Sequence, residues 1–157
     1  MEFQMPKFKY SVYGLDPDRT AKASGRDLRI SSKAAREICH ALKDMDLDDA
    51  KEFLEDVIDM KKMVPLKRHK RKKPHHKGLN KWYAGAYPVK AADAILAILD
   101  NVEANAEYKG LDIDRCRLIH IMAHRAMKIK NYISRAFGKS SPYFNTLTHI
   151  EVIVEEQ

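Results

Sequence analysis

The fold is decided by one stretch of the sequence, residues 115–154, which reads RCRLIHIMAHRAMKIKNYISRAFGKSSPYFNTLTHIEVIV. From Arg117 its first arm alternates with a period of two. This puts Ile119, Ile121 and Ala123 on one side, and Leu118, His120, Met122 and His124 on the other. The returning arm alternates too, and residues 130–142 between the arms supply the Gly, Ser and Pro that end pairing and form a bend. The stretch therefore predicts a long antiparallel β-hairpin.

This hairpin is too long to lie wholly on a small body. At about 3.3 Å per residue its arms span several tens of ångströms, so the far half must project. A projecting two-stranded ribbon is only marginally stable in water. The stretch has no Asp or Glu between Asp114 and Glu151, but it carries seven cations: Arg115, Arg117, Arg125, Lys128, Lys130, Arg135 and Lys139. We expect a polyanion to support the ribbon, although Arg115 and Arg117, near the body, are equally compatible with solvated charges.

The charge of the whole chain is unevenly distributed. The 157 residues are of one-domain size, so residues 1–157 are expected to form a single domain with a formal net charge of +7. Residues 61–90 hold 11 of the 29 Lys and Arg residues and residues 115–139 hold 7, whereas all 22 Asp and Glu lie elsewhere. The sequence therefore predicts a slightly acidic body with two cationic limbs, whose self-repulsion phosphates would relieve.

Cysteine usage and hydropathy indicate the compartment. Cys39 and Cys116 form neither a disulfide framework nor a metal-binding spacing, so we expect buried thiols in a reducing compartment. No apolar run approaches membrane-spanning length, and the first residues lack the apolar core of a signal peptide. We expect a cytoplasmic protein with no membrane insertion.

Three amphipathic helices are expected before the hairpin. A short strand at residues 26–30 precedes the first helix, which Ser31 or Ser32 caps; the second begins within residues 46–49; the third starts at Pro88 and ends at Gly110. Residues 6–20 are interpreted as an extended tail. Its rings either pin the tail to its own domain or stack on bases, and the sequence leaves both open for Phe8, Tyr10 and Tyr13. The expected fold is α+β, with three helices packed on a small antiparallel sheet and a long projecting C-terminal hairpin.

A basic loop, residues 61–87, interrupts the helices and follows no hydrophobic periodicity. Its predicted RNA-contacting residues are Lys67, Arg68, Lys70, Arg71, Lys72, Lys73, Lys77, Lys81 and Trp82. A charge run of this kind is also compatible with a solvated loop. The rings of Trp82 and Tyr83 either stack on bases or anchor the loop to the core, and the sequence leaves this choice open.

The sequence gives no indication of catalysis. Cys116, His120 and His124 would share one strand face, but at a spacing of four residues they lie about 13 Å from one to the next and cannot share one zinc ion. His69, His75 and His76 have no nearby carboxylate or thiolate. Paired carboxylates, an activated nucleophile and a Gly-rich phosphate loop are not recognisable. We expect no catalytic residues, no metal site and no cofactor, and therefore no enzyme.

Several motifs resemble a known family. They are Lys130 with RAFGK at residues 135–139, HIEVIV at residues 149–154, RDLRIS at residues 26–31 leading into AAR at residues 34–36, and NVEANAE at residues 101–107. Together they resemble the universal large-subunit ribosomal protein family numbered twenty-two, over residues from about 26 to 154. The basic loop resembles the insertion of archaeal and eukaryotic members. Bacterial members have more basic tips that lack aromatic residues like those here, which are Tyr132, Phe137, Tyr143 and Phe144.

The resemblance implies a structural constituent of the large ribosomal subunit that binds large-subunit rRNA and aids assembly. It implies that the body lies on the solvent side near the polypeptide exit tunnel, among neighbouring ribosomal proteins, while the hairpin runs through rRNA. The tip that would line the tunnel and meet the nascent polypeptide comprises Arg135, Ala136, Phe137, Gly138 and Lys139. Outside this resemblance, the charge pattern is also compatible with a free-standing nucleic-acid-binding regulator, whereas a small basic nuclease lacks a visible carboxylate-histidine pair.

Overall fold

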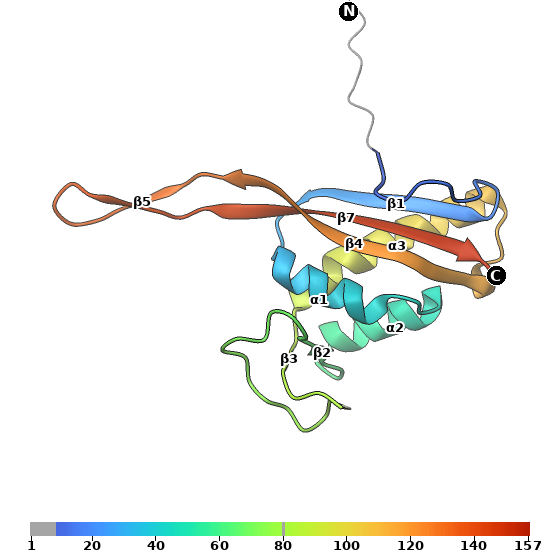
Figure 1. The fold of residues 1–157 in the computed structure, drawn as a ribbon, viewed down its shortest axis with the longest axis horizontal. Coiled ribbons are helices and arrows are strands. Elements are labelled where there is room, and N and C mark those ends of the chain that lie inside the picture. The colour runs from blue at the N-terminus through green and yellow to red at the C-terminus, as the bar shows by residue number, and fades with distance from the viewer. Residues whose placement is uncertain (1–8, 80) are drawn as a thin grey trace, which may run out of the picture.

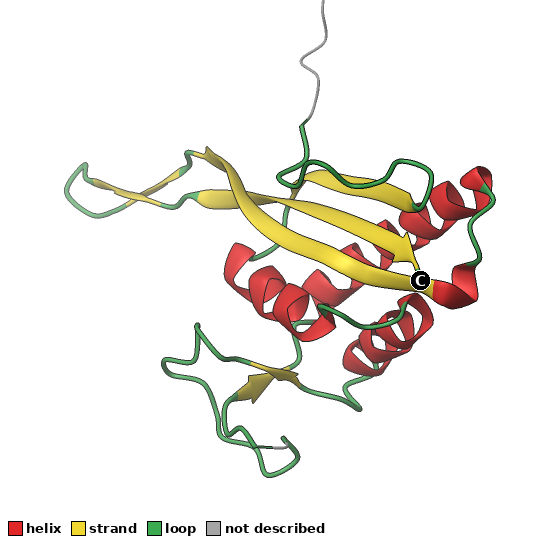
Figure 2. Cartoon of the chain, turned by 45° about the vertical axis from the view of Figure 1, so that its right-hand side comes forward, coloured by secondary structure: helices red, strands yellow, loops and turns green. Residues whose placement is uncertain are grey.

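The computed structural model describes residues 9–79 and 81–157, so Phe8 lies outside the described residues. Within them, three α-helices cover one face of a three-stranded antiparallel sheet (Figures 1 and 2). The helices are α1 (Ser32–Leu42), α2 (Leu47–Ile58) and α3 (Val89–Lys109), and a 3-10 turn, η1, spans Ile113–Arg115. The strands are β1 (Thr20–Leu28), β2 (Val64–Pro65), β3 (Gly85–Ala86), β4 (Cys116–Ile129), β5 (Tyr132–Ser134), β6 (Ser140–Pro142) and β7 (Asn145–Glu156). The α+β architecture predicted from the sequence is confirmed.

The returning arm of the hairpin, β7, is also the central strand of the sheet. It lies between β1 and β4, and both neighbours run antiparallel to it. Val154 is paired with Ala21 on one side and with Leu118 on the other. β7 is almost continuously buried from Leu147 to Val154, because it is the central strand, the helices cover one of its faces and Ser11 contacts Glu151 on the other. The hairpin is therefore rooted in the hydrophobic core.

The first strand begins earlier than the sequence indicated. Residues 26–30 alternate in polarity, but β1 spans Thr20–Leu28 and contains the small residues Ala21 and Ala23. Both alanines are buried where β1 packs against α3 and pairs with β7. The predicted strand was misplaced because tertiary packing of small side chains decides this edge strand, and intrinsic strand propensity does not.

The helix boundaries follow the signals in the sequence. The Ser31 hydroxyl accepts a hydrogen bond from the backbone N–H of Ala34 and caps α1. Gly110 ends α3 in the left-handed conformation, with φ of 74°. Pro88 precedes α3 as its N-cap. None of the helices in residues 9–79 and 81–157 combines the length and apolarity that crossing a membrane requires.

One core fills the space between the sheet and the helices, with Leu42, Leu54 and Leu99 fully buried in it. Both cysteines lie in this core, as predicted. Burial raises the pKa of the Cys39 thiol to about 12, so this group is a protonated apolar side chain at neutral pH.

A β-bulge in β4 changes which residues face the core. Leu118 is paired with Val154 and His120 with Ile153, so Ile119 is an extra residue without a partner. Leu118 therefore shares the helix-facing side with Ile121, and both are buried. The strict alternation predicted from Arg117 was wrong at this point, and it also placed Cys116 on the wrong face relative to His120.

The hairpin projects from one end of the sheet as predicted, with its far part free of the body (Figure 1). The bend is shorter than the predicted residues 130–142, because β5 and β6 resume pairing between Tyr132 and Pro142. Ser140 and Pro142 therefore lie in a strand, which Pro tolerates in a ribbon that is all edge.

Truncation of a core side chain tests the common core. We expect Leu99→Ala to lower the free energy of unfolding by about 2–5 kcal/mol, because it removes buried methyl groups and leaves a cavity. Urea unfolding followed by circular dichroism measures the change. Leu96→Ala on the same helix, where the side chain is only partly buried, should cost clearly less. Equal losses for the two variants would contradict the packing described.

Candidate nucleic-acid interface

The far part of the hairpin is a bare cationic ribbon. Residues 127–140 are exposed without exception. Among the residues that the structure describes, no carboxylate lies within ion-pair distance of Arg125, Lys128, Lys130, Arg135 or Lys139. The ion pairs of the described chain all involve other cations. The positive charge of the ribbon is therefore uncompensated within the described part of the chain.

The two cations nearest the body differ from the rest. Arg115 Nε lies 3.5 Å from Asp112 Oδ2. Arg117 Nε lies 3.9 Å from Asp46 Oδ1 and donates to the carbonyl oxygen of Asp44 at 2.8 Å. Both side chains are substantially exposed, so these ion pairs are weak. RNA contact by Arg115 and Arg117 stays a prediction, and the body offers both residues partners of its own.

The tip is a tight turn that displays an aromatic ring. Lys139 N–H donates to the carbonyl of Ala136 at 3.4 Å, and Arg135 N–H donates to the carbonyl of Lys139 at 2.8 Å. The two central residues, Phe137 and Gly138, have φ of 56° and 65°, which is the backbone of a type I′ turn. Gly adopts this conformation freely, whereas Phe adopts it at a cost of about 1–3 kcal/mol. The Phe137 side chain is 97% exposed, so the strained position presents a bare ring at the end of the ribbon.

A second aromatic pair lies lower on the ribbon. The rings of Tyr132 and Phe144 meet edge to face, with centroids 5.7 Å apart. Tyr143 beside them is 59% exposed. These rings face solvent on a strand pair without a core, so they are available for stacking on bases.

The basic loop is tied down at its beginning by Glu37, a residue that sequence reasoning missed. The Glu37 side chain on α1 is fully buried, and its two oxygens accept hydrogen bonds from three consecutive backbone N–H groups. These belong to Lys67, Arg68 and His69, at 2.8–3.1 Å. The arrangement is an anion nest, in which backbone donors satisfy a buried carboxylate. Its sequence signal is weak, because Glu37 resembles any helix carboxylate until the loop is placed above it.

The loop is also closed at its base by its own aromatic residues. Leu66 N–H donates to the carbonyl of Ala84, next to the short β2–β3 pair. Trp82 Nε1 donates to the carbonyl of Leu66 at 3.0 Å, and its ring stacks on that of Tyr83 at 5.1 Å. Lys70 Nζ lies 5.1 Å from the centroids of both rings. Trp82 therefore anchors the loop, which is one of the two alternatives left open, and its contact with RNA stays a prediction.

The predicted cations of the loop all face solvent. Lys67, Arg68, Lys70, Arg71, Lys72, Lys73, Lys77 and Lys81 are exposed. The body thus carries two cationic limbs. The hairpin extends from the end of the sheet, and the basic loop lies on the far side of the helices from the sheet (Figure 1).

A polar cluster on the outer face of the sheet joins the N-terminal segment to β4 and β7. The Nε2 atoms of His120 and His124 lie 2.9 and 3.0 Å from Glu151 Oε1. Ser11 donates to the same carboxylate from its hydroxyl and from its backbone N–H. The two imidazoles therefore converge on one oxygen, and the expected separation of about 13 Å was wrong for their rings because both lean toward Glu151.

This cluster shifts the titration of the carboxylate. Burial would raise the pKa of Glu151, but hydrogen bonds from Ser11, His120 and His124 outweigh burial and lower that pKa to about 2. Groups of three or more His, Cys, Asp or Glu arranged to hold a metal ion are absent from the described residues.

The fold and the interface together define a class: small α+β proteins that carry an uncompensated cationic ribbon on a compact body. The sequence model of one family, described as ribosomal protein L22p/L17e, matches residues 23–155. The chain belongs to this family. It is therefore a structural constituent of the ribosome, a cytoplasmic particle, and is not an enzyme.

Several archaeal proteins are similar to the chain over nearly their whole length. The large ribosomal subunit protein uL22 of Methanopyrus kandleri is 52% identical, with 98% of this chain and 100% of that protein aligned. The uL22 proteins of Methanocaldococcus jannaschii and Archaeoglobus fulgidus are 50% and 45% identical, over 97% and 96% of this chain and 97% of each relative. The archaeal and eukaryotic type of the family inferred from the sequence is confirmed.

The anion nest gives a first prediction for the interface. We expect Glu37→Gln to speed amide hydrogen exchange at Lys67, Arg68 and His69 by about tenfold or more, because charge-assisted hydrogen bonds are lost. Exchange measured by NMR reports each amide. Glu55→Gln on the exposed side of α2 is the control and should leave these amides unchanged. Unaltered exchange in Glu37→Gln would refute the role of the nest.

The cluster on the outer face of the sheet predicts how the stability of the protein depends on pH. Because the pKa of Glu151 is lowered on folding, its stabilising contribution is complete above the ordinary carboxyl range and is lost as pH falls toward about 2. Glu151→Gln should therefore lower stability at pH 7 and flatten the fall in the free energy of unfolding between about pH 5 and pH 2. Urea unfolding at a series of pH values measures both effects. The control, Glu155→Gln, should keep the pH dependence of the wild type. If the free energy of unfolding of Glu151→Gln ran parallel to that of the wild type over this pH range, the lowered pKa assigned to Glu151 would be contradicted.

Proposed function

We propose that the chain binds large-subunit rRNA, aids assembly of the large ribosomal subunit and contributes its hairpin tip to the wall of the polypeptide exit tunnel. The observation that carries the proposal is the uncompensated ribbon: a projecting two-stranded segment with cations and, among described residues, no carboxylates paired to them. Such a ribbon is marginal alone and stable when phosphates surround it. The uL22 relatives are proteins of the large subunit, which supports rRNA as the polyanion.

The mode of recognition follows from the side chains available. Lys128 and Lys130 on one arm, with the loop cations, neutralise phosphates without reading sequence. The exposed rings of Tyr132, Tyr143 and Phe144 supply stacking surfaces for unpaired bases. The protein would thus recognise the shape and backbone of folded RNA, with few contacts to base edges.

The tip is suited to a narrow passage. Its backbone reverses within residues 135–139, and Ala136 and Gly138 add little bulk. Phe137 is almost fully exposed at the end of the ribbon, where a passing nascent polypeptide would meet it. Neighbouring ribosomal proteins would contact the body, whose acidic residues lie outside both limbs.

Charge removal on the ribbon tests rRNA binding. We expect Lys128→Gln with Lys130→Gln to weaken binding of the full chain to archaeal large-subunit rRNA and to reduce the slope of log affinity against log salt by about two. Filter binding over a KCl series measures both quantities. The matched control is Lys61→Gln with Lys62→Gln, because Asp59 and Asp56 already pair with these lysines at 2.8 and 2.7 Å. An equal effect of the two double variants would refute a specific role for the ribbon.

A cross-linking experiment tests the position of the tip. We expect a photoreactive phenylalanine analogue at Phe137 to cross-link to a nascent polypeptide in ribosomes stalled during translation. The same analogue at Tyr108, an equally bare side chain on α3, should not. Cross-links from Tyr108 alone would overturn the tunnel assignment. Failure of the protein to co-sediment with large subunits at low salt would favour a free-standing regulator instead.

A further inference from the structure

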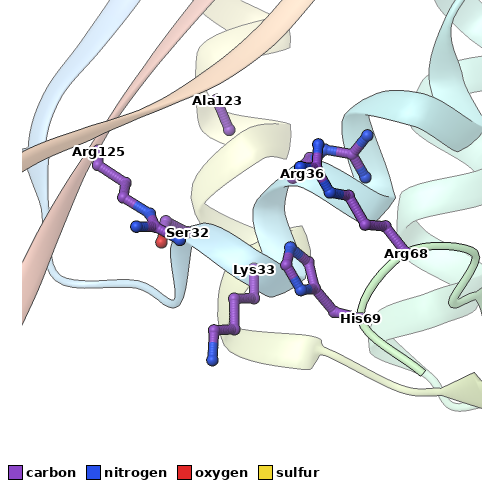
Figure 3. Close-up of a pocket in the computed structure, with 7 residues that line it drawn as sticks. All are labelled: Ser32, Lys33, Arg36, Arg68, His69, Ala123 and Arg125. Carbon is purple, nitrogen blue, oxygen red and sulfur yellow. The ribbon is translucent and has the colours of Figure 1, made fainter. Parts of the chain in front are cut away.

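A cationic cleft lies where the roots of the two limbs meet. Its volume is about 200 Å³. Figure 3 shows Arg125 entering it from the hairpin and Arg68 and His69 from the basic loop, with α1 between them. Three segments that are distant in the sequence therefore line one cavity: Ser32, Lys33 and Arg36 from α1, Arg68 and His69 from the loop, and Arg125 from β4.

The walls of the cleft are held in place by interactions of the fold itself. The bulge at Ile119 turns Ile121 and Ala123 toward the helices, and Arg125 continues this series just beyond the edge of the core. On the opposite wall, the anion nest of Glu37 fixes the backbone of Arg68 and His69 against α1. The two walls are thus held by a sheet register and by a buried carboxylate.

Three of the four Lys and Arg residues in the cleft lack a carboxylate partner among the residues that the structure describes. Within residues 9–79 and 81–157, no carboxylate lies within ion-pair distance of Lys33, Arg68 or Arg125. Arg36 does have one, because its Nη1 lies 3.3 Å from Glu37 Oε1. That carboxylate is fully buried and is already shared by three backbone N–H groups, so it neutralises little of the cleft.

The first turn of α1 adds to the positive potential. It contains Lys33 and no acidic residue, although acidic residues are the ones that stabilise a helix N-terminus. The free protein is therefore electrostatically unfavourable at this point, and a bound anion would reverse the sign of the effect. Guanidinium groups from two walls suit a tetrahedral anion with several acceptor oxygens.

We propose that this cleft binds a backbone phosphate of RNA, held between Arg125 of the hairpin and Arg68 of the loop. The proposal rests on the proposed function, because it assumes that the polyanion is RNA. One phosphodiester in the cleft would fasten both limbs to the same strand, so that the loop and the hairpin are positioned by a shared contact.

A double-mutant cycle tests the shared phosphate. Arg68→Gln, Arg125→Gln and the double variant are compared with the wild-type chain in filter binding to archaeal large-subunit rRNA over a KCl series. We expect each single variant to lower affinity about tenfold, and the double variant to lose clearly less than the product of the two losses. The salt slope of the double variant should fall by about one, as for one phosphate, and not by about two.

Lys43→Gln supplies the control, because Lys43 is an exposed cation at the other end of α1. The loss of affinity caused by Lys43→Gln and the loss caused by Arg125→Gln should multiply in the variant that carries both, with no coupling between the two sites. Phosphate-ethylation interference gives a second measurement that needs only well-folded protein: ethylation at a discrete phosphate should weaken the wild type and should no longer affect the double variant.

The outcomes separate the inference from the proposed function. Wild-type protein that binds rRNA, with losses from Arg68→Gln and Arg125→Gln that multiply independently, would overturn the cleft alone. Ethylation that interferes equally with the wild type and the double variant would likewise overturn only the cleft. Wild-type protein that shows no salt-dependent binding to rRNA would overturn both.

Discussion

The structure depends on one strand with two roles. β7 is hydrogen-bonded on both sides in the core, where it pairs with β1 and β4, and the same strand runs outward to form half of the ribbon. Its inner part, from Leu147 to Val154, is almost fully buried, whereas β5 and β6 beyond it are almost wholly exposed. The exposed outer part of the hairpin therefore has no hydrophobic core of its own. It is held at its root by the packing of Ile150, Val152 and Val154 against the helices.

Charge separates the body from its limbs. Carboxylates of the body pair with cations of the body or right beside it: Lys51 of α2 pairs with Asp100 and Glu103 of α3, and Lys62, at the start of the basic loop, pairs with Asp56 of α2. The exposed part of the hairpin has no such compensation among the described residues. This division lets the body fold on its own hydrophobic core while the limbs keep their charge for an external anion. Glu37 and Glu151 are exceptions that show how buried carboxylates are handled, because hydrogen-bond donors surround each of them.

Much of the fold follows from local signals, and the differences arise where distant segments meet. Helix caps at Ser31 and Gly110 and the apolar stripes of the helices were predictable, because they depend on neighbours in the sequence. The bulge at Ile119 was not, because an extra residue leaves the hydrophobic pattern plausible in either register. The cations of the interface could be named from composition. The nest at Glu37 and the convergence of His120 and His124 on Glu151 could not, because each requires long-range contacts that no spacing rule encodes.

The bulge at Ile119 also indicates where the length of this strand can vary. It sets which face of the sheet each side chain of residues 120–125 takes, and a second register shift follows between Arg125 and Lys128. Loss of Ile119 itself would only remove the bulge, because Leu118 and His120 would then follow each other opposite Val154 and Ile153 in a regular ladder. Loss of one residue between Ile121 and Arg125 would instead turn Arg125 to the other face of the sheet, away from α1. Natural variants of the strand should therefore lose a residue at the bulge far more readily than within residues 121–125.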